Sequence, residues 1–179
     1  MSEIMETEAW YALRVTYSRE LIVKQLLDAA GIDNFLPMHY EYVMKRGQRV
    51  RQLVPAVHNL LFAHTTREKL DAFKSTPGMD TTVRYIMDRE TRQPIIVPDI
   101  QMHSFILVAS TYEEAVLYMH PEELHIAKGT KVRITSGVFC GAIGEFVRIR
   151  HDRRVVVNIE GVMAVATTFV HPAMVEAIE

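Results

Sequence analysis

Three glycines and one phenylalanine, spaced within residues 137–144 (GVFCGAIG), constrain the fold of this 179-residue chain more than any other feature. A tight turn between strands needs positive φ, which glycine adopts without steric cost. Gly137, Gly141 and Gly144 therefore predict a turn followed by a sharp bend of the next strand. Phe139, inside the same stretch, is expected to fold back as an apolar plug beneath the turn.

The residues around this stretch alternate or run apolar in short segments. Residues 131–135 precede it, and 142–150, 154–160 and 163–170 follow, with 174–178 as a last strand. Short strands at this spacing are typical of a small barrel. We therefore expect residues 128–179 to form an all-β, SH3-like barrel.

The first 110 residues have a different, mixed pattern. Residues 10–17 and 34–44 have strand character, with an amphipathic helix over 19–30 between them and Ser18 as its N-cap. KRGQ at 45–48 predicts a hairpin tip before the return strand. The remaining predicted elements are a strand over 59–65, a helix capped by Thr66, a short strand over 82–87 and an amphipathic helix from Pro98. This order predicts an α+β domain with helices on one face of an antiparallel sheet.

Charge divides the chain in the same way. Residues 1–110 hold 13 basic and 13 acidic residues, whereas residues 128–160 hold seven basic and three acidic ones. Glu113, Glu114, Glu122 and Glu123 make residues 111–127 acidic, so we expect a linker there. The net charge of −2 argues against a conventional duplex-DNA binder, which carries a basic surplus.

The composition also indicates a compartment. The single cysteine, Cys140, cannot form an internal disulfide, which fits a reducing compartment. The N-terminus lacks an apolar signal core, and no apolar run approaches the ~18 residues of a membrane span. We expect a cytoplasmic monomer with no membrane contact.

Enzymatic constellations are missing from the sequence. The eight histidines form no metal-binding spacing, and neither a GxGxxG loop nor a nucleophile elbow occurs. The sequence therefore predicts no catalytic residue, no metal and no cofactor.

The glycine stretch resembles the KOW motif, carried here by Gly129, Gly137, Phe139, Gly141 and Gly144. The first half resembles the N-terminal (NGN) domain of NusG transcription factors, which has a Trp-Tyr strand, a basic hairpin and then a strand of the Phe-Pro-Gly-Tyr type. The matching residues are Trp10-Tyr11, KRGQRVR and VHNLLFA. The family's Phe-Pro-Gly-Tyr is replaced by Val57-His58-Asn59-Leu60, and an alternative register places Pro55-Ala56 on Pro-Gly.

The resemblance implies an antiterminator without catalysis, which binds the clamp helices of the largest RNA polymerase subunit and suppresses pausing or termination. The residues expected to bind polymerase are Trp10, Tyr11, Phe35, Val57, Asn59 and Leu60. Adjacent strand residues point to opposite faces, so at most one of Trp10 and Tyr11 belongs to the sheet core. His64-Thr65-Thr66 is similar to an HTT element of specialised relatives, and the alternative is a strand end followed by a helix cap.

Two basic groups have open interpretations. Lys45, Arg46, Arg49 and Arg51 at the hairpin tip are expected either to contact non-template DNA or nascent RNA, or to be a solvated tip. Arg148, Arg150, Arg153 and Arg154 flank a predicted turn at His151-Asp152 and mark a surface for a partner or nucleic acid, or ordinary surface. In the family, this domain recruits a termination factor or a ribosomal protein.

The departures from the family pattern indicate a specialised paralogue. The Asp88–Pro94 turn and the acidic linker look similar to UpxY-like regulators of capsule and exopolysaccharide operons. The competing hypothesis is a KOW protein that binds RNA or ribosomes without a polymerase role. The predicted N-terminal domain argues against it, since ribosomal KOW proteins lack that domain.

Overall fold

The computed structural model describes residues 7–123 and 129–179, and the chain divides into two compact units. The first unit comprises Met1–Pro37 and Val57–Asp99, and the second comprises Met38–Ala56 and Ile100–Glu179. The sequence placed a domain boundary near residue 110. The contacts instead group the hairpin over 38–56 and the helix that follows Asp99 with the C-terminal strands.

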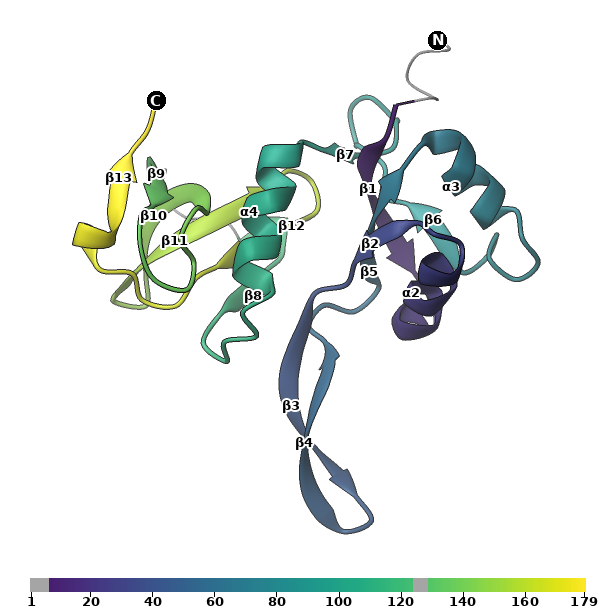
Figure 1. The fold of residues 1–179 in the computed structure, drawn as a ribbon, viewed down its shortest axis with the longest axis horizontal. Helices are drawn as coiled ribbons and strands as arrows, with labels where there is room; N and C mark the ends of the chain where they lie inside the picture. The colour runs from purple at the N-terminus through teal and green to yellow at the C-terminus, as the bar shows by residue number, and fades with distance from the viewer. Residues whose placement is uncertain (1–6, 124–128) are drawn as a thin grey trace. The chain divides into compact units, whose positions relative to one another are not determined.

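The first unit is built on a five-stranded antiparallel sheet (Figure 1). The apolar side chains of Tyr11, Leu13 and Val15 alternate along its central strand and are buried, as expected for one face of a sheet. The order is β2-β5-β1-β6, and β7 also pairs with β1. The strands are β1 (Ala9–Val15), β2 (Asp33–Phe35), β5 (Leu60–Thr65), β6 (Val83–Tyr85) and β7 (Ile96–Val97).

The described residues of this unit form two helices, α2 (Glu20–Ala29) and α3 (Arg67–Lys74). The side chain of Thr66 caps α3 by accepting a hydrogen bond from the Lys69 backbone N–H at 3.3 Å, which confirms the predicted cap. The predicted Ser18 cap is wrong. The N-cap of α2 is Arg19, with no side-chain hydrogen bond, and Ser18 has a φ of 51°.

The predicted strand over 34–44 is two strands. β2 ends at Phe35, and β3 (Met38–Lys45) begins after Leu36 and Pro37. Proline has no backbone N–H to donate to a ladder, which is consistent with a break there. β3 pairs with β4 (Gln48–Pro55) in a two-stranded hairpin whose tip is Arg46-Gly47, so the predicted tip is confirmed.

The second unit contains a six-stranded antiparallel sheet in the order β13-β9-β10-β11-β12-β8. The five strands after residue 128 were predicted, and β8 was not. Pairing of Met119 with Ala164 shows that part of the predicted acidic linker is a strand of this sheet, while residues 124–127 lie outside the described residues. The strands are β8 (Leu117–Met119), β9 (Thr130–Ile134), β10 (Ile143–Ile149), β11 (Asp152–Ile159), β12 (Met163–Ala166) and β13 (Val175–Ala177).

Helix α4 (Asp99–Ala109) belongs to the second unit except for its first residue, Asp99. It was predicted to be amphipathic, but apolar residues are not confined to its buried side: Ile100 is 68% exposed, whereas the polar Ser104 is buried with Met102, Phe105 and Val108. The Ser104 hydroxyl accepts a hydrogen bond from the Ile143 backbone N–H at 3.0 Å, which ties the helix to β10.

Candidate partner-binding surfaces

The Trp-Tyr pair of β1 divides between the two faces of the first unit's sheet. Tyr11 is 1% exposed, and its ring contacts that of Tyr85, with centroids 5.6 Å apart. Trp10 is half-buried, and its ring lies 5.0 Å from that of His64. The prediction that at most one of the pair lies in the core is confirmed. Tyr11 is a core residue, so it is not available for the predicted contact with a partner.

Pairing between strands places further predicted residues on the Trp10 face. Trp10 faces His64 across the β1–β5 ladder, and Phe35 faces Phe62 across the β2–β5 ladder. Because side chains alternate along β5, all four residues share one face. Phe62 is fully buried, while Trp10, Phe35 and His64 keep part of their surface accessible.

The segment that replaces Phe-Pro-Gly-Tyr is a turn before β5. Val57 is half-buried, Asn59 is exposed with a φ of 63°, and Leu60 is buried at 4% exposure. The carboxylate of Glu20, itself only 2% exposed, accepts a hydrogen bond from the Asn59 backbone N–H at 2.7 Å. The sequence did not indicate this role of Glu20. Leu60 is therefore a core side chain, and the accessible predicted residues here are Val57 and Asn59.

A polar cluster stabilises the Tyr11 face of the same sheet. The Tyr85 hydroxyl donates to the Asp71 carboxylate at 2.8 Å, and the Lys74 ammonium lies 3.9 Å from the Tyr85 ring centroid. Burial, aided by the hydrogen bond to Asp71, raises the pKa of Tyr85, and burial lowers the pKa of Lys74. These contacts join α3 to β6, so the cluster is explained by packing.

The three residues of the element similar to HTT have three different structural roles. His64 contacts Trp10, Thr65 is buried at the end of β5, and Thr66 caps α3. The structure therefore accounts for the two threonines by packing and capping. His64 remains as an accessible side chain on the Trp10 face.

The four basic residues of the hairpin are all exposed. The Arg49 guanidinium lies over the Tyr42 ring at 4.2 Å, and the Arg51 guanidinium lies over the Tyr40 ring at 4.0 Å. Arg51 also forms an ion pair with Glu114 at 2.9 Å. No role was predicted for the two tyrosines, although their spacing of two residues in a predicted strand places them on one face.

The glycine turn of the second unit has the predicted backbone. Gly137 and Gly141 have φ of 85° and 93°, and Phe139 is 4% exposed beneath the turn. A Cβ at Gly144 would collide with the backbone carbonyl of Val156 on β11. Glycine is thus required at 137 and 141 by conformation and at 144 by close packing of two strands.

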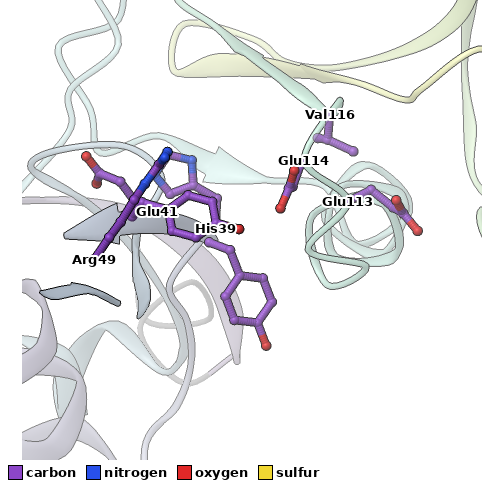
Figure 2. A pocket seen from close by; sticks show the side chains of 8 residues that line it. His39, Glu41, Arg49, Glu113, Glu114 and Val116 are labelled. Carbon is purple, nitrogen blue, oxygen red and sulfur yellow. The ribbon is translucent and has the colours of Figure 1, made fainter. Parts of the chain in front are cut away.

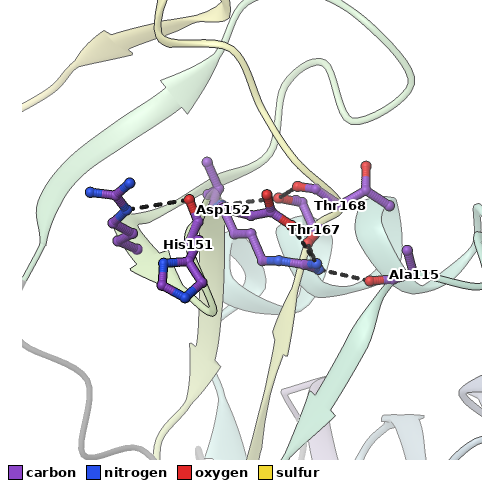
Figure 3. Close-up of polar contacts among 8 residues, drawn as sticks. Ala115, His151, Asp152, Thr167 and Thr168 are labelled. Carbon is purple, nitrogen blue, oxygen red and sulfur yellow. Dashed lines mark hydrogen bonds and ion pairs between the residues drawn. The ribbon is translucent and has the colours of Figure 1, made fainter.

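The four arginines after the turn do not form one surface. Arg148, Arg150 and Arg153 are exposed, but Arg154 is 9% exposed, so its predicted surface role is wrong. Its Nη1 donates to the backbone carbonyls of Ala115 at 2.7 Å and Thr167 at 2.8 Å (Figure 3). Arg154 fixes the segment before β8 to the segment after β12. The turn itself is Arg150-His151, one residue before its predicted place.

Two further properties concern the described part of the chain. Residues 7–123 and 129–179 bring together no group of three or more His, Cys, Asp or Glu side chains suited to a metal ion. Within the same ranges, no helix combines the length and apolar character needed to cross a membrane.

Comparison with known proteins gives a match to one family model and matches to solved structures. The family model described as NusG, transcription termination factor nusG, matches residues 8–106. One of these structures, titled "Domain interaction in Thermotoga maritima NusG", is 21% identical, covers 97% of this chain and 98% of its own, and has a TM-score of 0.46. No curated protein matches this chain.

Proposed function

Because this chain belongs to the NusG family of transcription factors, we propose that it binds RNA polymerase through its first unit and suppresses pausing or termination. The observation that carries this proposal is the Trp10 face. Trp10, His64 and Phe35 are accessible there on a sheet whose other face is filled by Tyr11 and the core. Aromatic side chains anchored on a rigid sheet are the residue type that dominates protein–protein binding energy.

The proposed target is the pair of clamp helices in the largest polymerase subunit. Half-buried aromatic and aliphatic side chains suit the apolar stripe of a helix, and Val57 and Asn59 extend the proposed contact at the start of β5. Tyr11 and Leu60 are omitted because both are buried.

No catalysis is needed for the proposed effect. A protein that binds one conformer of polymerase more tightly shifts the population toward that conformer. A tenfold reduction in pausing requires only about 1.4 kcal/mol of differential binding. We propose that the bound conformer is the one with a closed clamp.

The second unit is proposed to supply the additional contacts. Its six-stranded sheet with the Gly137–Gly144 corner is proposed to be a KOW barrel, and Arg148, Arg150 and Arg153 are proposed to recruit a termination factor or ribosomal protein. The basic hairpin tip is proposed to contact non-template DNA or nascent RNA.

A role confined to particular operons is the finest level of the proposal. It is supported by the departures at 57–60 and by the Asp88–Pro94 turn. In that turn the Asp88 carboxylate accepts from the Glu90 and Thr91 backbone N–H groups, at 2.9 and 2.7 Å. A read-through reporter of a long capsule or exopolysaccharide operon, with and without its native leader, tests this level.

Affinity capture tests polymerase binding directly. Tagged protein is expected to retain RNA polymerase from a bacterial lysate, and Trp10→Ala is expected to weaken purified polymerase binding about tenfold, because truncating an aromatic anchor removes a dominant contact. Tyr17→Ala is the matched control, since Tyr17 is 76% exposed and lies outside the proposed surface.

Circular dichroism should show that both variants keep the wild-type fold. Equal polymerase binding by Trp10→Ala and wild type would contradict the assignment of the face. Capture of ribosomes without polymerase would favour the hypothesis of an RNA- or ribosome-binding KOW protein.

A further inference from the structure

One face of the β3–β4 hairpin is both aromatic and basic. Cross-strand register pairs Tyr42 with Arg51 and Met44 with Arg49, and Tyr40 lies two residues before Tyr42 on the same face. Tyr42 is 54% exposed and Met44 is 69% exposed. Large apolar side chains are thus held at the surface of a two-stranded element that has no core of its own.

The arginines of this face lie diagonally over the tyrosines. The Arg49 guanidinium lies over the Tyr42 ring, and the Arg51 guanidinium lies over the Tyr40 ring. Each pair brings a guanidinium group to an aromatic ring, and both kinds of group are surfaces on which nucleic-acid bases stack. Because Arg51 is engaged by Glu114, the pair nearer the tip, Tyr42 with Arg49, is the more accessible one.

A hollow of 380 Å³ lies beside this pair, within the second unit. Figure 2 shows Arg49, Glu41 and His39 on the hairpin side and Glu113, Glu114 and Val116 on the opposite side. The volume lies at the small end of the range for ligand pockets, which begins at roughly 300 Å³. It suits one planar group of nucleobase size, and not a folded partner.

The charges of the two sides select the part of a nucleotide that can enter. Glu113 and Glu114 would repel a phosphate, but a carboxylate accepts hydrogen bonds from the exocyclic amino group of a base. Lys45 and Arg46 at the exposed tip carry the positive charge that attracts the phosphates of the flanking chain.

We propose that this hollow binds one unpaired base of a single-stranded nucleic acid, stacked on Tyr42 beside Arg49, with its exocyclic amino group toward Glu113 and Glu114. A base within a duplex is excluded because both of its faces and its amino group are occupied. The inference rests on the proposed function only in that polymerase would present the single strand to the hairpin. Binding itself needs no polymerase.

The test measures binding of fluorescent 12-nucleotide strands to the full-length chain by anisotropy at fixed salt. The strands are oligo-dC, oligo-dT, oligo-rC and a mixed-sequence DNA strand, alone and in its duplex. We expect oligo-dC to bind more tightly than oligo-dT, and the single strand more tightly than its duplex. Comparison of oligo-dC with oligo-rC distinguishes DNA from RNA as the source of the base.

Variants separate stacking from a structural role of Tyr42. Tyr42→Ala is expected to weaken oligo-dC binding at least fivefold, in line with the loss of one base–aromatic stack. Tyr42→Phe keeps the ring and should stay within twofold of wild type. Val50→Ala, on the opposite face of the same hairpin, controls for loosened strand pairing and should also stay within twofold.

Three results would overturn the inference: equal binding by Tyr42→Ala and wild type, equal binding of the duplex and its single strand, or equal binding of oligo-dT and oligo-dC. Polymerase capture by Tyr42→Ala, measured in parallel, should match wild type. Loss of oligonucleotide binding by Tyr42→Ala with polymerase capture intact would therefore support the hollow as the binding site. Failure of the wild type to capture polymerase would instead contradict the proposed function.

Discussion

Two hairpins of the second unit have the same type of turn but differ in how far their strands are buried. The β3–β4 hairpin turns at Arg46-Gly47 with φ of 49° and 78°, and the β10–β11 hairpin turns at Arg150-His151 with φ of 49° and 77°. Positive φ at both central residues is the geometry of a two-residue type I′ turn, which matches the twist of paired strands. The turn therefore determines the pairing in both cases and does not distinguish their roles.

The difference lies in what the strands bury. In β11, Val155, Val156 and Val157 are all buried in succession, whereas β3 exposes both Tyr42 and Met44. Consecutive buried residues mean that both faces of β11 are covered within the folded chain. The comparison indicates that the β10–β11 hairpin contributes to a core, whereas the β3–β4 hairpin presents an exposed surface.

The largest expected contrast comes from glycine substitutions. Gly144→Ala should destabilise the chain by about 3 kcal/mol or more, because the added methyl meets the Val156 carbonyl, which cannot move without breaking β11. Gly47→Ala should cost only about 1 kcal/mol, since its surroundings are empty and only the positive φ is strained. Chemical denaturation of both variants measures the difference. Equal losses would contradict the contrast between core and surface hairpins.

Arginine removal should give the next largest contrast. Arg154→Met leaves the carbonyls of Ala115 and Thr167 without their buried donor, so we expect a loss of about 2–4 kcal/mol. Arg51→Met removes an exposed ion pair with Glu114 and should cost about 0–1 kcal/mol. Thermal unfolding of the two variants is the measurement, and a larger loss for Arg51→Met would reverse the comparison.

Replacing His151, which occupies the turn position that Gly47 has in the other hairpin, should have a smaller effect of opposite sign. His151→Gly removes a side chain from a left-handed conformation and should stabilise the chain by about 0.5–1 kcal/mol, after the entropy cost of glycine is subtracted. Urea midpoints of the variant and wild type test this. A destabilised His151→Gly would show that the imidazole makes a contribution beyond its backbone conformation.

The smallest effect at neutral pH concerns Tyr118 on β8. Burial raises the pKa of Tyr118 to about 12, so the folded state favours the neutral phenol. The corresponding stability is fully present below pH 10 and is lost as the pH rises from 10 through 12. Tyr118→Phe should abolish this loss without changing pH 7 binding. The difference in tyrosinate absorbance between wild type and Tyr118→Phe, followed against pH with circular dichroism, isolates this residue, and a difference centred near pH 10 would contradict the burial.

Local chemistry made several features predictable from the sequence. The hairpin tip at 46–47, the glycine turn and the Thr66 cap all depend on residues within a few positions of one another. The division of Trp10 and Tyr11 between two faces follows from strand alternation alone. Which of them enters the core does not, because that depends on where α3 and Tyr85 pack.

Features that depend on distant residues could not be predicted in this way. β8 becomes a strand through pairing with β12, more than 40 residues later, although its surroundings are acidic. Arg154 is buried because carbonyls at 115 and 167 accept from it, and a single sequence does not reveal that convergence. The same holds for Glu20, whose carboxylate is matched by the backbone of Asn59.

Site-specific photo-crosslinking tests the central claim, that the Trp10 face contacts polymerase. A benzophenone amino acid placed at position 10 of the full-length chain should crosslink to the largest polymerase subunit on irradiation of the reconstituted elongation complex. The same probe at the exposed position 17 should give little or no product. Crosslinking from position 17 but not from position 10 would contradict the account, because the partner would then lie away from the Trp10 face.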